Sequence, residues 1–333
     1  MRIFEVKLKI MRTPQSFLAV IAMICFFSFQ SCKKNNDPVP DPVPVVKPDT
    51  LSSGWSKLVL SGETSFGDIF FNSSTTGYLV GSFIYKSTDG GNNWLQVSLY
   101  SGRYNIFITN DNKAFFVGQD YNILKTFDGG SNFVNTPIAG SPKDIFFSDN
   151  NNGFSITDNG LFNSTDAGLT WQKITTTGLP SIGSTYASLS FINSTTGWVV
   201  SQNGIHKSVG SLTNWQASVV NGGSSGNFGS VYAVSASVVY AANFSGEIFK
   251  STDGGANFSF IKKLEDVGIT DVHFLTDQIG YASAGRSIYK TSDGGTNWVK
   301  IVSLGQGSIT EIHFTDATHG WACGSNGVVL LFK

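Results

Sequence analysis

Beyond residue 50 the chain is a series of short apolar runs separated by polar, glycine-rich turns. A run of four residues such as Asp68-Ile-Phe-Phe71 is typical of a strand, because a helix would show a longer amphipathic period. The runs are followed by polar turns that end in Gly plus an aromatic residue, as in Gly77-Tyr78 and Gly320-Trp321. A second run, a short turn and a third run follow. The pattern predicts antiparallel strands joined by hairpins, without long helices.

One octapeptide returns after the third run of most units. Its first copy is Ser87-Thr-Asp89-Gly-Gly91-Asn-Asn-Trp94. The central Asp recurs as Asp128, Asp166, Asp253 and Asp293, and a degraded copy around Gly210 lacks it. Successive copies lie 39, 38, 44, 43 and 40 residues apart. A period near 40 residues with four strand signals in each unit is typical of a β-propeller.

The octapeptide has the composition of a tight turn. Its Asp can accept backbone N–H groups within the turn, and its glycines allow positive φ. The Trp or Phe at its end begins the next strand and is expected to point inward. Because repeated turns cannot all be active sites, we interpret the five repeated Asp residues as structural, namely Asp89, Asp128, Asp166, Asp253 and Asp293.

The number of units can be counted from their first strands. These begin near Asp68, Asn105, Asp144, Ser188, Ser230, Asp271 and Glu311, which gives seven. The last unit stops at Lys333, before its fourth strand, whereas residues 54–58 resemble an isolated fourth strand. We therefore predict an all-β, seven-bladed β-propeller of four-stranded antiparallel blades. Residues 54–60 should pair antiparallel with residues 326–333 and close the ring.

The octapeptide resembles the Asp-box, or BNR repeat, of sialidases and related propellers. Copies that read Ser-Thr-Asp-Gly-Gly-x-Asn-Trp look most like those of the photosystem II stability/assembly factor group. The resemblance covers residues 55–333. It implies a propeller and, as in the best-known members of that group, a non-enzymatic assembly role in holding membrane-protein partners. It does not imply photosynthesis.

The first 50 residues have the layout of export and tethering segments. Residues 17–29 form an apolar run of 13 residues, too short to span a bilayer, and lead to Ser31-Cys32. This resembles a bacterial lipobox, although Phe29 stands where Leu is usual. An ordinary cleaved signal is the alternative. We predict a signal peptide over 1–31, a lipidated Cys32 that starts a proline-rich tether over 32–50, and the propeller over 51–333.

This layout resembles that of envelope proteins of Bacteroidota-type bacteria. It implies a lipid-anchored protein of the cell envelope, expected at the outer membrane, with the propeller in the periplasm or outside the cell. Met1 and Met11 are alternative start residues, because the segment from Met11 alone has the complete signal layout.

Charge and composition narrow the function. From residue 51 onward there are 15 Lys+Arg and 19 Asp+Glu, a net charge of −4 without a basic stripe, which disfavours nucleic-acid binding. Only Cys323 lies in the folded part, so no internal disulfide can form. Only Arg103 and Arg286 remain after residue 50, too few for the three-arginine clamp of a sialidase.

The candidate binding surface is the face opposite the octapeptide turns. Loops that enter the first strands share this face with the turns between second and third strands. The residues expected there are Asp68, Asp144, Asp271, Glu311, Arg103, Tyr104, Tyr121, Tyr186 and Arg286. His273 and His313 occupy equivalent strand positions and could form a metal or proton-transfer pair, but Phe or Tyr at the matching positions favours packing.

The sequence therefore favours a monomeric, non-catalytic binding or assembly module for a protein or glycan, with no cofactor and no metal. The alternative is a glycoside hydrolase or lyase that uses paired carboxylates among Asp68, Asp144, Asp271 and Glu311.

Overall fold

The computed structural model describes residues 45–51, 54–182, 187–264 and 268–333. The signal peptide, Cys32 and most of the tether lie outside these residues, so their assignment stays a prediction. The described residues belong to one compact unit that starts at Pro42. In this part of the chain we find strands and turns without helices, and therefore no helix that could cross a membrane.

The strands form seven sheets, which we number as blades in chain order. Blade 1 contains β3 (Asp68–Phe71), β4 (Gly77–Val80), β5 (Ile84–Ser87) and β6 (Leu95–Ser98), and blade 2 contains β7 (Arg103–Asn110), β8 (Lys113–Gly118), β9 (Asn122–Thr126) and β10 (Val134–Pro137). Blade 3 contains β11 (Pro142–Phe147), β12 (Gly153–Thr157), β13 (Gly160–Ser164) and β14 (Gln172–Lys173), and blade 4 contains β15 (Ala187–Phe191), β16 (Gly197–Ser201), β17 (Gly204–Ser208) and β18 (Trp215–Ala217).

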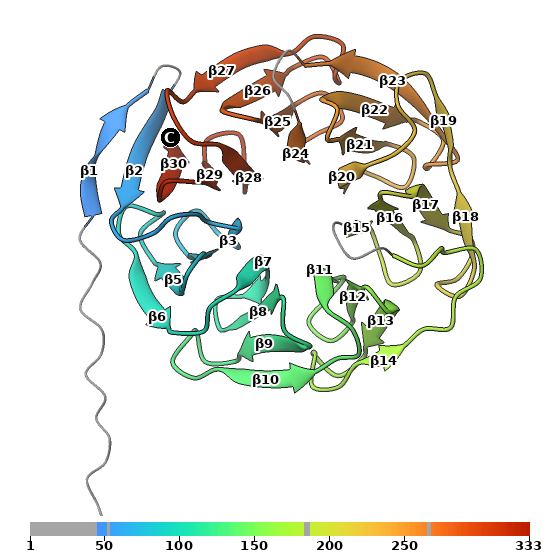
Figure 1. Ribbon diagram of the computed structural model, residues 1–333, viewed down its shortest axis with the longest axis horizontal. Helices are drawn as coiled ribbons and strands as arrows, with labels where there is room; N and C mark the ends of the chain where they lie inside the picture. The colour runs from blue at the N-terminus through green and yellow to red at the C-terminus, as the bar shows by residue number, and fades with distance from the viewer. Residues whose placement is uncertain (1–44, 52–53, 183–186, 265–267) are drawn as a thin grey trace, which may run out of the picture. The chain divides into compact units, whose positions relative to one another are not determined.

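Blade 5 contains β20 (Phe228–Ala233), β21 (Val239–Asn243), β22 (Glu247–Ser251), β23 (Asn257–Lys263) and the outer strand β19 (Val219–Asn221). Blade 6 contains β24 (Ile269–Phe274), β25 (Gly280–Ala284), β26 (Ser287–Thr291) and β27 (Val299–Ser303). Blade 7 contains β28 (Ile309–Phe314), β29 (Gly320–Gly324), β30 (Val328–Phe332), β2 (Trp55–Leu60) and β1 (Val45–Thr50). The blades surround a common axis, with the first strand of each innermost (Figure 1). The seven-bladed all-β fold predicted from the sequence is confirmed.

The ring closes as predicted. Strand β2 pairs antiparallel with β30, with Trp55 opposite Phe332 and Val59 opposite Val328. The indole of Trp55 is fully buried and lies 5.9 Å from the Phe314 ring, centroid to centroid. The seventh blade is therefore built from both ends of the propeller sequence.

Two blades carry a fifth, outer strand that the sequence did not predict. Strand β1, within the segment assigned to the tether, pairs antiparallel with β2. Strand β19 pairs parallel with β23. The register of β1 shifts between Val46 and Asp49, around Pro48. Proline is accepted at such an irregular edge position because it has no N–H to donate.

Aromatic stacking joins neighbouring blades. The indole of Trp321 in the last blade stacks on Phe71 of the first, with centroids 3.8 Å apart, and its Nε1 donates to the Gly90 carbonyl over 3.0 Å. The glycine before this Trp is needed for close packing, because a Cβ on Gly320 would lie 2.2 Å from the Phe314 ring. The aromatic residue of this Gly-Trp pair therefore packs between two blades, whereas its glycine packs against the neighbouring strand of its own blade.

The octapeptides form the expected turns. The buried Ser87 Oγ donates to Asp89 Oδ1 over 2.9 Å and accepts from Gly91 N over 2.8 Å, while Asp89 Oδ1 also accepts from Asn93 N over 3.0 Å. Equivalent bonds recur at the other four Asp residues, namely Asp128, Asp166, Asp253 and Asp293. The carboxylate of each repeated Asp is therefore engaged in hydrogen bonds within its own turn.

The octapeptide turns also contact the preceding blade. Lys86 Nζ donates to the carbonyl of Gly129 over 2.8 Å, and Lys125 Nζ donates to that of Gly168 over 2.6 Å. Each of these bonds reaches from one blade to the octapeptide of the next. The octapeptide is therefore part of the interface between blades as well as a turn.

Candidate functional site

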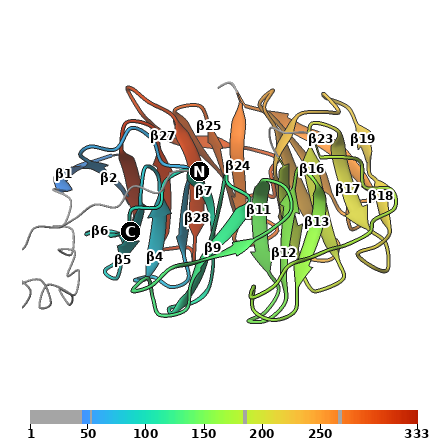
Figure 2. The ribbon, with the colours of Figure 1, turned by 60° about the horizontal axis from the view of Figure 1, so that its bottom comes forward.

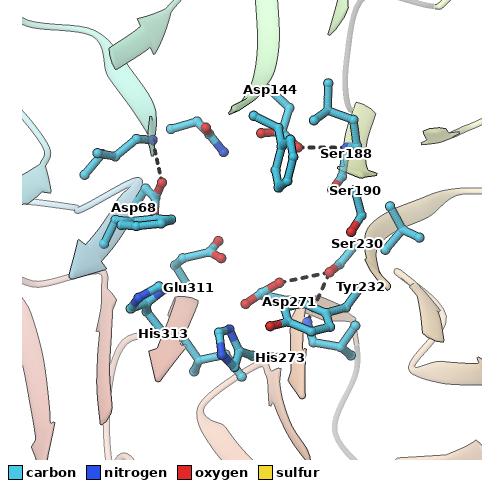
Figure 3. Close-up of a pocket in the computed structure, with 18 of the residues that line it drawn as sticks. Asp68, Asp144, Ser188, Ser190, Ser230, Tyr232, Asp271, His273, Glu311 and His313 are labelled. Atoms are coloured by element: carbon cyan, nitrogen blue, oxygen red, sulfur yellow. Dashed lines mark hydrogen bonds between the residues drawn. The ribbon is translucent and has the colours of Figure 1, made fainter. Parts of the chain in front are cut away.

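A cavity of about 430 Å³ lies on the axis of the ring and is lined by the first strand of every blade (Figure 3). Side chains alternate between the two faces of a strand, so residues two apart on these inner strands point to the same side. The first set of lining residues is Asp68, Asn105, Asp144, Ser188, Ser230, Asp271 and Glu311. The second set, two residues further along each strand, is Phe70, Phe107, Phe146, Ser190, Tyr232, His273 and His313.

The strands of the blades run between the two faces of the ring (Figure 2). We call the face that carries loop 99–102 and turn 119–121 the acid face, and the opposite face, which carries the octapeptide turns, the box face. Strand directions alternate in each antiparallel blade. The first set, at the start of the inner strands, is therefore nearer the acid face. The second set, which we call the aromatic set because most of its members have ring side chains, is nearer the box face.

Three members of the first set link their inner strand to a neighbouring blade. Asp68 Oδ2 accepts from Ile106 N over 2.6 Å, and Asp144 Oδ2 accepts from Leu189 N over 2.8 Å. At the corresponding place Ser230 Oγ accepts from Val272 N over 3.1 Å. A polar side chain at this repeat position thus satisfies a backbone donor that the neighbouring strand cannot, which explains its recurrence with the blade period.

Burial and mutual repulsion disfavour ionisation of the axial carboxyl groups. Burial raises the pKa of Asp68 to about 8 and that of Asp144 to about 7. It also raises the pKa of Asp271 and Glu311, and in the case of Glu311 the nearby Asp271 carboxylate adds to the effect. No Lys or Arg is among the described residues that line the cavity. The four carboxyl groups therefore have no cationic partner there.

The two axial histidines belong to the aromatic set. Burial lowers the pKa of His273 to about 3 and that of His313 to about 4, so both are neutral near pH 7. Their rings lie 5.3 Å apart, centroid to centroid, and His313 Nε2 lies 2.7 Å from the carbonyl oxygen of Phe71. Within the described residues no group of three His, Cys, Asp or Glu side chains is arranged to hold a metal ion.

The structure brings four of the predicted site residues together and separates the others. Asp68, Asp144, Asp271 and Glu311 share the axial cavity. Tyr121 and Arg286 are exposed in turns of the acid face, 64% in the case of the Tyr121 side chain. The Tyr104 hydroxyl is instead engaged with the carbonyls of Pro142 and Gly118. Arg103 begins β7, and only its backbone is described; Tyr186 lies outside the described residues.

A further exposed group was missed from the sequence. Leu99 is 71% exposed and Tyr100 is 43% exposed, both in the loop before β7. Gln119 N donates to the carbonyl of Gly102 over 3.3 Å, which holds this loop beside the turn of Tyr121. We call Leu99, Tyr100 and Tyr121 the blade 2 patch. The other large hydrophobic side chains that are exposed in the described chain lie on outer strands or octapeptide turns.

The sequence does contain a signal for this patch. In blade 1, Ile84 pairs with Ser98, and Tyr100 follows two residues later. The corresponding residues of three other blades are Ile138, Leu264 and Leu304, and they are only 6%, 4% and 5% exposed. Tyr100 is thus an aromatic residue at a repeat position that elsewhere holds a buried aliphatic side chain.

Comparison with known proteins assigns the family. The family model described as photosynthesis system II assembly factor YCF48 matches residues 47–139 and 132–263, together more than half of the chain. The chain belongs to this family. Comparison of the sequence with curated proteins gave no match.

Solved structures support the YCF48-like propeller at the level of fold. A YCF48 structure bound to D1 peptide has a TM-score of 0.70 and 21% identity, and covers 87% of this chain and 99% of its own. YCF48 from Cyanidioschyzon merolae has a TM-score of 0.67 and 21% identity, with coverages of 84% and 98%. An ancestral GH74 enzyme has a TM-score of 0.63 and 18% identity, and covers 84% of this chain but 45% of its own.

Proposed function

We propose that this YCF48-family chain is a non-catalytic binding and assembly module that presents its acid face to a protein partner. The observation that carries this proposal is the blade 2 patch, three large side chains exposed on one face beside a hydrogen-bonded loop and turn. One of the similar solved structures is YCF48 bound to D1 peptide, so a propeller of this kind can hold a peptide ligand. A protein partner is therefore favoured over a glycan.

The patch has the chemistry of an interface anchor. Tyrosine is enriched among the residues that dominate the binding energy of protein interfaces. Covering Leu99 and Tyr121 would remove apolar area that is worth roughly 2–3 kcal/mol in total. That gain is large enough to matter for affinity.

The proposal is tested with matched surface variants of the purified protein. A Leu99→Ser/Tyr121→Ser variant removes the patch, and a Val134→Ser/Val299→Ser variant removes equally exposed aliphatic groups from the outer strands β10 and β27. Both should keep the unfolding midpoint of the wild type. We expect proteins of the native cell envelope that bind the wild type to bind the outer-strand variant equally and the patch variant at least about tenfold more weakly. Equal binding by all three proteins would disprove the role of the patch.

We also propose that Cys32 carries the lipid that places the propeller at the cell envelope, with the outer membrane as the expected site. The support is the sequence around Cys32 and the proline-rich segment behind it. The chain with Cys32→Ser should lose incorporation of a labelled fatty acid and should leave the membrane fraction. Incorporation that persists in this variant would show that the lipobox interpretation is wrong.

Glycoside hydrolysis is the second candidate. It is favoured by the four carboxyl groups in one cavity and by the similarity to a GH74 propeller. Two features weigh against it. Asp271 accepts a hydrogen bond from the Ser230 hydroxyl, and Asp68 and Asp144 accept backbone N–H groups, so three of the four carboxyl groups already serve the ring. Turnover of any aryl-glycoside or polysaccharide that disappears in Glu311→Gln, with folding intact, would promote this candidate.

A further inference from the structure

The acid face also indicates what kind of protein segment it fits, an inference that rests on the proposed binding function. The blade 2 patch adjoins carboxyl groups: Asp120 precedes Tyr121 in the turn, and Asp158 lies in the equivalent turn of blade 3. The axial cavity beside them is lined by four carboxyl groups and, among the described residues, no cation. Patch and cavity are connected through β7, which begins just after the patch loop and supplies Asn105 and Phe107 to the cavity.

Within the described chain, one hydrogen-bond acceptor of the cavity has no donor. The side-chain oxygen of Asn105 is buried and has no hydrogen-bond donor. Asp68 and Asp144 accept backbone N–H groups and Asp271 accepts from Ser230 Oγ, but none of these three carboxyl groups has a cationic partner among the described residues of the cavity. Deeper in the cavity, the aromatic rings of Phe70 and Phe107 lie 5.3 Å apart. Acceptors around the entrance with aromatic faces below them are the combination that binds a guanidinium, which has five N–H donors in one plane and stacks on aromatic rings.

We propose that the partner segment is basic, that its apolar side chains cover the blade 2 patch, and that one of its arginine side chains enters the axial cavity. Arginine fits better than lysine because its planar group can satisfy several acceptors at once, whereas an ammonium is a compact and strongly hydrated charge. The negative net charge of the folded part also favours a basic partner.

This occupancy predicts a definite pH dependence. Since the free carboxyl groups are partly protonated near neutral pH, a guanidinium that enters must favour their ionised form and release protons. Affinity should therefore rise between about pH 6 and pH 9 and then level off. The titratable groups that face the cavity or act on its carboxyls are Asp68, Asp144, Asp271, Glu311, His273, His313, Tyr232 and Cys323.

The experiment uses small probes on the whole purified protein, so that it does not depend on the patch. Acetyl-arginine amide is compared with acetyl-citrulline amide, which has the same shape without charge, by isothermal titration in two buffers of different ionisation enthalpy. For a ligand of this size a Kd of about 1 mM is expected for the arginine probe, and at least about tenfold weaker binding for citrulline. The buffer dependence should report proton release at pH 7.

Variants locate the bound probe. Asp68→Asn keeps an oxygen that can accept from Ile106 N but removes the charge, and should weaken arginine binding at least about fivefold. Asp149→Asn, which removes a carboxylate of the β11–β12 turn on the box face, should leave it unchanged. A cooperative unfolding transition well above the temperature of the titration in both variants shows that neither effect comes from misfolding.

Three results would overturn the inference: no saturable binding of the arginine probe at about 50 mM, equal binding of arginine and citrulline, or equal effects of Asp68→Asn and Asp149→Asn. These results leave the proposed function intact if the patch variant still loses its partner. The converse result is a patch variant that binds both the arginine probe and its partner as well as the wild type does. That result would reject the blade 2 patch as a contact of the partner and would leave the axial cavity as the arginine site.

Discussion

The third octapeptide contains Ala167 where the other intact copies have glycine, and this exception allows a sharp test of the turn. The backbone φ of Ala167 is 59°, in the left-handed region, and the equivalent glycines Gly90, Gly129, Gly254 and Gly294 have φ between 69° and 74°. An L-residue in this region costs about 1–2 kcal/mol, whereas Gly costs about 0.5–1 kcal/mol in unfolded-state entropy. Ala167→Gly should therefore stabilise the protein by about 0.5–1 kcal/mol.

The reciprocal change is the matched control. Gly90→Ala introduces a left-handed alanine, and its Cβ would also lie 2.9 Å from the carbonyl oxygen of Ser74. It should destabilise the protein by at least about 1 kcal/mol. Urea unfolding followed by tryptophan fluorescence measures both as shifts of the midpoint at constant slope. Loss of stability in Ala167→Gly, or a gain in Gly90→Ala, would refute the explanation of these positions by backbone strain.

Three further predictions concern the turn, the closure and the cavity. Ser87→Ala leaves the buried N–H of Gly91 without an acceptor and should cost about 1–3 kcal/mol in urea unfolding, whereas loss of no more than a few tenths would contradict the role of the hydroxyl. Trp55→Ala removes a fully buried indole from the closing strand and should cost about 3–5 kcal/mol; a smaller loss than for Val299→Ala, an exposed strand position, would show that closure contributes little. Because the pKa of Asp68 is raised to about 8, its contribution to stability is present below the unfolded pKa near 4 and is lost as pH rises towards 8, so Asp68→Asn should make the unfolding midpoint less sensitive between pH 5 and pH 8. An equally steep profile in wild type and variant would show that Asp68 is ionised in the folded protein.

The repeat allowed most of the fold to be predicted, because each blade is specified locally. The sequence showed an isolated fourth strand at Trp55 and a last unit that ends at Lys333 without its fourth strand. Pairing of these two segments was therefore predicted, and it is observed between β2 and β30. Strand β1 could not be predicted, since its prolines indicate an extended tether and its pairing partner is a strand whose edge is visible only after folding. The same holds for β19, which joins β23 of the blade that follows it.

The axial site was predicted in position but not in chemistry. The blade period placed Asp68 and Asp144 on one ring. The backbone donor that each accepts belongs to the neighbouring blade, about 40 residues away, and no local pattern encodes that bond. Burial on the axis, which raises the pKa of these carboxyl groups, is likewise a property of the closed ring. Leu99 and Tyr100 escaped notice because apolar loop residues at the blade junctions are usually buried.

The departures from the repeat are the places where a function beyond folding can reside, because the repeated features are already explained by the ring itself. Blade 2 concentrates such departures. Its entry loop exposes Tyr100 where other blades bury an aliphatic residue, and its inner strand has Asn105 where its two neighbours have Asp. The Asn105 oxygen has no donor, whereas Asp68 and Asp144 on either side accept N–H groups from the next blade. A partner that approaches from blade 2 would therefore meet the exposed patch first and then the unsatisfied acceptor. Most of the partner should lie over blade 2, with a side chain that reaches the axis, and substitutions in blade 2 should weaken binding more than equivalent substitutions in blade 5.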